Sequence, residues 1–205
     1  MDRERERLSA SASETFVTRV SLWQCLRHPR RQLVAFDDLP PTLSTLPLLT
    51  WGLLTGIAVI GSCLYGASLS LVFPQWRPTA SALWLALSAG MGWCVFGPVL
   101  VAATRRNAFT LAHACLVTMA YGEAVLVTGA LLNVMLRWTN LMAAVPPGPF
   151  NLAWVTLSNI VMAAVLTVQL GAIQVPKWKT LLIWMAALNG SGAFFFWWFQ
   201  RLLRG

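Results

Sequence analysis

Five long apolar runs constrain the fold of this chain more than any other feature of its sequence. Each run is close to the ~20 residues that a helix needs to cross about 30 Å of hydrocarbon, and exceeds the apolar stripe of a soluble helix. The sequence therefore predicts an all-α polytopic membrane bundle of five transmembrane helices. The expected spans are residues 47–73, 80–103, 109–136, 152–173 and 180–202.

The composition supports this prediction. Hydrophobic residues make up 57% of the 205 residues and charged residues only 11%, whereas a soluble domain carries about 25% charged residues. This excludes a soluble enzyme, a disordered tail and a nucleic-acid-binding domain. The net charge of +8 does not reverse that conclusion, because the basic residues flank the apolar runs, where they meet lipid phosphates or set topology. We expect membrane lipids as partners and no nucleic acid.

A polar, basic leader at residues 1–45 precedes the transmembrane domain at residues 46–205. In the leader, a capping box predicts an amphipathic helix over about residues 12–27, which Pro29 should end. Two readings stay open, a helix lying on the membrane surface and a solvated helix packed on loops. The arginines expected to meet lipid headgroups or a partner protein are Arg19, Arg27, Arg30 and Arg31.

The distribution of basic residues predicts the orientation of the bundle. Eleven basic residues fall on the side of the leader and four on the other side. The positive-inside rule then places the N-terminus in the cytoplasm and the C-terminus outside. Without the leader the two sides carry four basic residues each, so this prediction depends on the leader.

Glu123 is the only acidic residue inside an apolar run. An ionised carboxylate at that depth costs about 3 kcal/mol or more, so the side chain must be protonated, paired or facing a wet cavity. Small residues share its side of the helix, which predicts that Glu123 points into the bundle. Two interpretations follow: a group that handles protons, ions or a polar partner, or a protonated side chain that only holds the bundle together.

His113 lies in the same run, about 15 Å from Glu123 along the helix, so the two side chains cannot touch. A single histidine can ligate haem iron or a chlorophyll magnesium, but the alternative is an interfacial histidine near a helix start. The other histidine, His28, belongs to the leader, which excludes a bis-histidine haem inside the bundle. We expect no cofactor, with a pigment or lipid near His113 as the open alternative.

Pairs of small residues spaced four apart let helix backbones approach closely, within this chain or with a partner helix. These pairs are Gly52 with Gly56, Ser88 with Gly92, and Thr167 with Gly171. In the second run Pro98 removes the amide that would bond the carbonyl of Cys94, which predicts a kink.

Catalytic and metal-binding signatures are missing from the sequence. There is no Ser/His/Asp set, HExxH, P-loop or acidic metal cluster, and the four cysteines lack metal-ligand spacing. We therefore expect no enzyme, no catalytic residue and no metal site.

Short strings along the chain carry one family resemblance. They are LRHPR at residues 26–30, Tyr65-Gly66, residues 105–111, AYG at residues 120–122, and residues 175–179. In this layout the chain resembles bacterial members of the Yip1 superfamily, five-span proteins with a cytoplasmic polar leader. That resemblance implies a bacterial inner membrane, a periplasmic C-terminus and no catalytic residues. Glu123 departs from the family pattern, which often has proline there, and the eukaryotic DLYGP-type motif is missing.

Three functional hypotheses follow from the sequence. The first is a non-enzymatic scaffold or accessory subunit that packs against other integral membrane proteins. The second is a permease or proton-coupled component that uses Glu123. The third is an accessory subunit of a photosynthetic or respiratory complex, which contacts a pigment or lipid near His113.

Overall fold

The computed structural model describes residues 22–37, 48–73, 75, 77–139 and 145–204. In these ranges the chain is almost entirely helical and contains no strand. The elements are α2 (Leu22–Arg27), α3 (Pro29–Asp37), α4 (Leu48–Val72), α5 (Pro78–Thr104), α6 (Ala108–Trp138), α7 (Pro147–Ala172), α8 (Lys177–Ile183), the π-helical segment η3 (Trp184–Asn189) and α9 (Gly190–Arg204).

Five helical segments are long and apolar enough to cross a membrane, which confirms the predicted fold class. The fourth span begins at Pro147, five residues before the expected position. Proline fits the first turn of a helix because its missing amide has no partner there anyway. The fifth span joins α8, η3 and α9, so its helix widens over Trp184–Asn189, where the sequence analysis expected a single regular helix.

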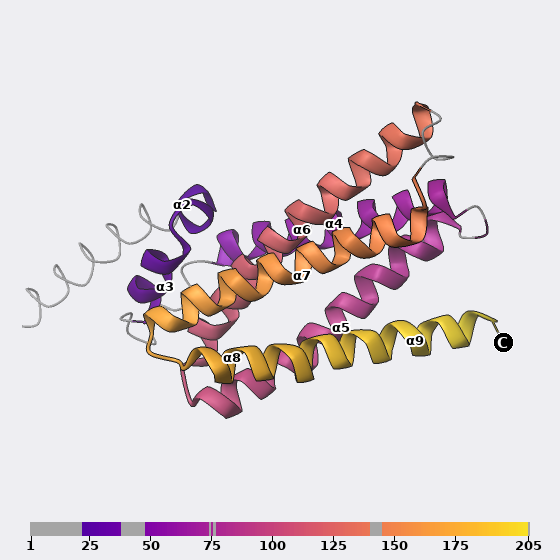
Figure 1. Cartoon of the computed structure of the whole chain (residues 1–205). Coiled ribbons are helices and arrows are strands. Elements are labelled where there is room, and N and C mark those ends of the chain that lie inside the picture. Colours follow the sequence, from indigo (N-terminus) through magenta and orange to yellow (C-terminus); the bar gives the residue numbers. More distant parts are fainter. Residues whose placement is uncertain (1–21, 38–47, 74, 76, 140–144, 205) are drawn as a thin grey trace, which may run out of the picture.

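The helix α6 is the centre of the bundle. Half of its most apolar stretch is buried within the chain, compared with 22% for α5, α7 and the fifth span. In Figure 1, α4 and α7 lie alongside α6, while α5 lies between them and α9. The large hydrophobic side chains on the outer faces, such as Leu49, Ile60 and Leu152, are exposed. A bundle with this surface needs lipid around it.

The end of the bundle next to the leader holds the largest apolar core. Leu33 of α3 is fully buried there together with side chains of α5, α6 and α7. Trp184 of η3 packs edge-on against Trp93 and Phe96 of α5, with ring centroids 6.0 and 5.7 Å apart. Edge-to-face pairs of this kind add about 0.5–1.5 kcal/mol each beyond their buried area. This core joins η3 firmly to α5.

The described part of the leader forms two short helices that pack on the bundle. The break expected before Pro29 is present, but a second helix, α3, starts at Pro29. One side of these helices contacts the bundle, because Cys25 and Leu33 are fully buried there; contact of the leader with the membrane surface stays a prediction of the sequence. Residues 12–21 of the expected helix lie outside the described part of the chain.

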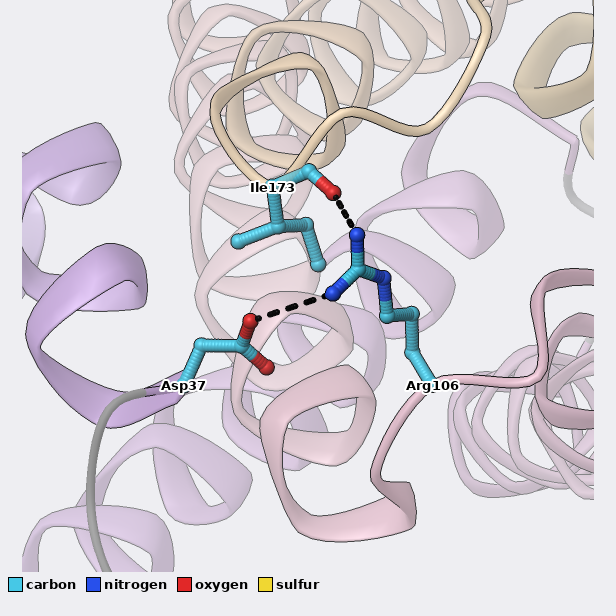
Figure 2. A network of polar contacts seen from close by, with 3 residues as sticks. All are labelled: Asp37, Arg106 and Ile173. Atoms are coloured by element: carbon cyan, nitrogen blue, oxygen red, sulfur yellow. Dashed lines mark hydrogen bonds and ion pairs between the residues drawn. The ribbon is translucent and has the colours of Figure 1, made fainter.

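An arginine outside the spans joins the leader to two other segments (Figure 2). Nη2 of Arg106 donates a 2.6 Å hydrogen bond to the carbonyl of Ile173, just after α7. Its Nη1 lies 3.6 Å from Oδ2 of Asp37, at the end of α3. A second anchor is the hydroxyl of Tyr121, which donates to the carbonyl of Leu26. These contacts hold α2 and α3 on the bundle.

The buried thiol of Cys25 allows a test of this docking. Burial raises its pKa to about 11, so about a thousandth of the thiol is ionised at pH 8, and only the thiolate reacts. We expect slow maleimide labelling that rises about tenfold per pH unit. Arg106→Ala should accelerate labelling at pH 8, because a released thiol returns toward an ordinary pKa of about 8.5.

Labelling is best measured by mass spectrometry in a background with Cys63, Cys94 and Cys115 replaced by alanine. Arg105→Ala is the matched control, because Arg105 is the neighbouring arginine in the same connection and its side chain is exposed. Equal labelling rates in the two arginine variants would contradict the docking role of Arg106.

Candidate functional site

Glu123 is 6% exposed in the middle of α6. The hydroxyl of Ser62 on α4 donates a 2.8 Å hydrogen bond to its Oε1. The second carboxyl oxygen, Oε2, is buried and has no hydrogen-bond partner among the described residues. Leaving a buried polar atom unpaired costs about 1–3 kcal/mol, and more for a charged group. The site therefore has an unfilled hydrogen-bonding position.

A glycine makes room for the carboxyl group. A Cβ atom at Gly61 would lie 2.7 Å from Cβ of Glu123 and 2.9 Å from its Oε2. Real Cβ atoms essentially never approach this closely. Gly61 thus lets Glu123 lie against the backbone of α4, directly beside its partner Ser62.

A cavity of about 300 Å³ adjoins Glu123. Side chains of α4, α5, α6, α7, η3 and α9 line it, so all five spans contribute. Its polar lining consists of Ser62, Ser88, Glu123, Ser158, Asn159 and Asn189. The rest of the wall is apolar and includes Trp93, Leu126 and Phe196. Pockets that bind small molecules combine an apolar wall with a few polar groups in this way.

Half of the polar residues at the cavity, Ser158, Asn159 and Asn189, donate to backbone carbonyls. Ser158 donates to Gly122 at 2.9 Å, and Asn159 donates to Val155 at 2.9 Å. The hydroxyl of Ser88, by contrast, is buried without a partner. Among the described residues, Glu123 and Ser88 are therefore the two that line the cavity with a fully buried polar atom lacking a hydrogen-bond partner. Thr110 and Gln169 also carry such an atom but do not line this cavity.

The mouth of the cavity lies between α7 and the fifth span. Asn189 and Ala193 are exposed on the fifth span, and Val155 on α7 is 36% exposed. Each of these residues lies within a membrane span. The opening therefore faces the hydrocarbon layer.

His113 lies near the start of α6 and is 1% exposed. The indole nitrogen of Trp51 donates a 3.1 Å hydrogen bond to its Nδ1. His113 does not line the cavity at Glu123. Among the described residues, no group of three His, Cys, Asp or Glu side chains is placed to hold a metal ion.

The small-residue pairs have different surroundings. A Cβ at Gly92 would lie 3.4 Å from the backbone of Gly192, so the Ser88–Gly92 pair marks a close approach of α5 and α9. The glycines of the other two pairs make no such close approach. No described atom lies within 4 Å of a Cβ built at Gly52, Gly56 or Gly171.

The remaining predicted residues are placed as follows. The hydroxyl of Thr167 donates to the carbonyl of Ala163 within its own helix. Pro98 lies inside α5, which stays helical on both sides of it. The arginines Arg27, Arg30 and Arg31 are exposed on α2 and α3. Arg19 lies outside the described residues.

A buried polar network near the opposite end of the bundle was missed by the sequence analysis. The Tyr65 hydroxyl donates to Oδ1 of Asn151 at 3.0 Å, and Nδ2 of Asn133 donates to the same atom at 2.8 Å. Nδ2 of Asn133 also lies 3.1 Å from the hydroxyl of Ser68. These bonds join α4, α6 and α7.

A signal for these partners exists in the first span. Small and polar residues follow a helical spacing at Ala58, Gly61, Tyr65 and Ser68. That spacing puts them on one face, which is the face that contacts α6. These residues are neutral, so no charge pattern in the sequence marks them as a network.

Comparisons of the chain with protein-family models, with curated proteins and with solved structures found no match.

The role of Gly61 gives a stability prediction with a matched control. Alanine favours helix over glycine by about 1 kcal/mol, so Gly52→Ala, which faces open space, should be neutral or stabilising. Gly61→Ala must displace Glu123, and overpacking of this kind costs about 1–3 kcal/mol. Thermal unfolding in detergent should therefore give a Tm several degrees lower for Gly61→Ala than for Gly52→Ala. Equal Tm values would disprove the close contact.

Proposed function

We propose that this multi-pass membrane protein is a permease or proton-coupled component that binds a small ligand or ion at Glu123. The observation that carries the proposal is the unpaired Oε2 of a buried carboxyl group beside a cavity. Ionisable groups inside a membrane are costly and commonly mark ion or proton pathways. The proposal gives Ser62 a positioning role, through its bond to Oε1, and assigns no catalytic residue or cofactor.

The π-helical segment supports this choice of site. The segment Trp184–Asn189 contributes Leu188 and Asn189 to the cavity wall. π-Bulges occur frequently at functional sites, because they widen the helix and disturb its hydrogen-bond ladder. The Nδ2 of Asn189 reaches the carbonyl of Trp184 at 3.5 Å, which partly compensates for the widened turn.

We further propose that the leader lies in the cytoplasm, at the inner membrane of a bacterium, with the C-terminus in the periplasm. The exposed arginines of α2 and α3, the arginines of the α5–α6 connection and the lysines at the start of α8 lie at the same end of the bundle as Asp37 and Ile173. The positive-inside rule assigns that end to the cytoplasm. Membership of the Yip1 superfamily stays a prediction of the sequence.

An accessory subunit or scaffold that packs against another membrane protein is the second candidate. It is favoured by Gly52 and Gly56, whose common face has open space beside it among the described residues. A GxxxG face lets a second helix approach closely. A role that holds a pigment near His113 has less support, because Trp51 already occupies its Nδ1.

The permease proposal predicts loss of transport when the carboxyl is removed. In proteoliposomes with a potassium diffusion potential, a trapped pH-sensitive dye should report proton flux in the natural protein. Glu123→Gln should reduce that flux to the level of empty liposomes, because the amide cannot release a proton. Thr128→Ala, at an exposed position on the same helix, is the control and should leave the flux unchanged. Unchanged flux in Glu123→Gln would reject the proposal.

The scaffold alternative predicts a stoichiometric partner. Purification in mild detergent followed by mass spectrometry should recover that partner with the natural protein. Gly52→Leu and Gly56→Leu should release it, whereas Leu64→Ala, on an exposed position of the same helix, should not. Recovery of the chain alone would argue against this alternative.

A further inference from the structure

We infer that the cavity beside Glu123 binds a lipophilic amine, a ligand with one ammonium group and an apolar body, which enters sideways from the hydrocarbon core. This inference rests on the proposed role of Glu123 as the binding group. It adds the chemical class of the ligand and its route of entry.

Two buried oxygen atoms without a hydrogen-bond partner indicate the chemistry of the ligand's polar head group. Oε2 of Glu123 and the hydroxyl of Ser88 are both buried without a partner, on two residues that line the same cavity. An ammonium group has several N–H donors and no acceptor, so it offers donors to the unpaired oxygens of this cavity. An anionic ligand would bring a second negative charge beside the carboxyl group, which is unfavourable at low dielectric.

A bare divalent cation is a poorer match to this wall. Calcium and magnesium take about six or more oxygen ligands in a well-defined shell. Here Glu123 is the only His, Cys, Asp or Glu residue among the described residues that line the cavity, so the wall offers a single carboxyl group to a cation. The free groups are therefore sufficient for one organic ammonium head rather than for a metal shell.

The apolar lining of the cavity indicates that the part of the ligand beyond its ammonium group is apolar. Leu85, Leu126, Leu188, Trp93 and Phe196 give the cavity a largely apolar lining. A hydrated sugar or amino acid would lose its water against these side chains without compensation. The two aromatic rings suit an aromatic body, and aromatic faces also attract cations. A volume of about 300 Å³ is at the small end of ligand pockets, which fits a phenylalkylamine.

The placement of the lining residues defines the route of entry. Every described residue that lines the cavity lies within one of the five spans, and none comes from a connection between them. Ala193 and Val155, at the mouth, are exposed on the outer surface of spans that lipid surrounds. A ligand that partitions into the bilayer therefore reaches Glu123 without crossing the aqueous ends of the bundle.

Calorimetric titration of the detergent-solubilised full chain tests the ligand class. The probe is phenylbutylamine, and phenylbutanol is its neutral counterpart of the same shape. We expect saturable binding of the amine and at least tenfold weaker binding of the alcohol. Glu123→Gln should weaken amine binding about tenfold or more, as expected for a lost charged hydrogen bond, and Ser88→Ala should weaken it severalfold. Both variants must elute as monodisperse protein, like the control Thr128→Ala, which should bind normally.

Two results would overturn the ligand class. They are equal affinity for the amine and the alcohol, and undiminished amine binding by Glu123→Gln. Proton flux that depends on Glu123 without amine binding would reject the ligand class and leave the proposed function intact. Amine binding through Glu123 with unchanged flux in Glu123→Gln would support the binding site and reject the proton-coupled function.

The route of entry has its own pair of variants. Ala193→Trp narrows the mouth without touching Glu123 and should abolish or strongly slow amine binding. Val168→Trp adds the same bulk on an exposed part of α7 away from the cavity and should bind like the natural protein. Normal binding by Ala193→Trp would reject entry between α7 and the fifth span.

Discussion

The contact between α4 and α6 is the interaction on which the rest of the bundle depends. The two helices run in the same direction, and side-chain hydrogen bonds join them at three levels. The bonded pairs are Trp51 with His113, Ser62 with Glu123, and Ser68 with Asn133. Hydrocarbon offers no competing partner, so a polar side chain between helices must bond within the protein. The three levels therefore set the register of α4 on α6, and α5, α7 and the fifth span pack around this pair.

Glu123 differs from the other polar groups of this contact. Asn133 and Asn151 bond to each other and to their neighbours, which makes their network a structural one. Glu123 has one bonded oxygen and one unbonded oxygen, and it adjoins a cavity. Gly61 leaves room for the carboxyl group, since the side chain of any larger residue at this position would push that group away. This unpaired oxygen beside a cavity is the basis of the ligand site proposed above.

Sequence patterns predicted some parts of this structure well and missed others. The five spans follow from hydropathy, and the burial of Glu123 follows from the small residues on its side of the helix. The helix α3 was not expected, because Pro29 reads equally as the end of one helix and the first residue of another. The π-helical widening at Trp184–Asn189 has no signal in the sequence, because residues of these types are common in regular transmembrane helices. Gly52 and Gly56 have the spacing of a helix contact, but no described part of this chain contacts their face, so only contact with a partner helix stays open for them.

The sequence by itself determined that five helices lie in lipid and that one of them carries a carboxyl group at mid-depth. Both are local properties, because apolarity is summed over a single continuous stretch of about 20 residues. Only the tertiary structure decided that Ser62 bonds one oxygen, that Gly61 makes room, and that Ser88 shares the cavity. Those residues lie on other helices, and Ser62 is 61 positions away from Glu123 in the chain. Helix rotation and register bring them together, and these are set by packing across the whole bundle.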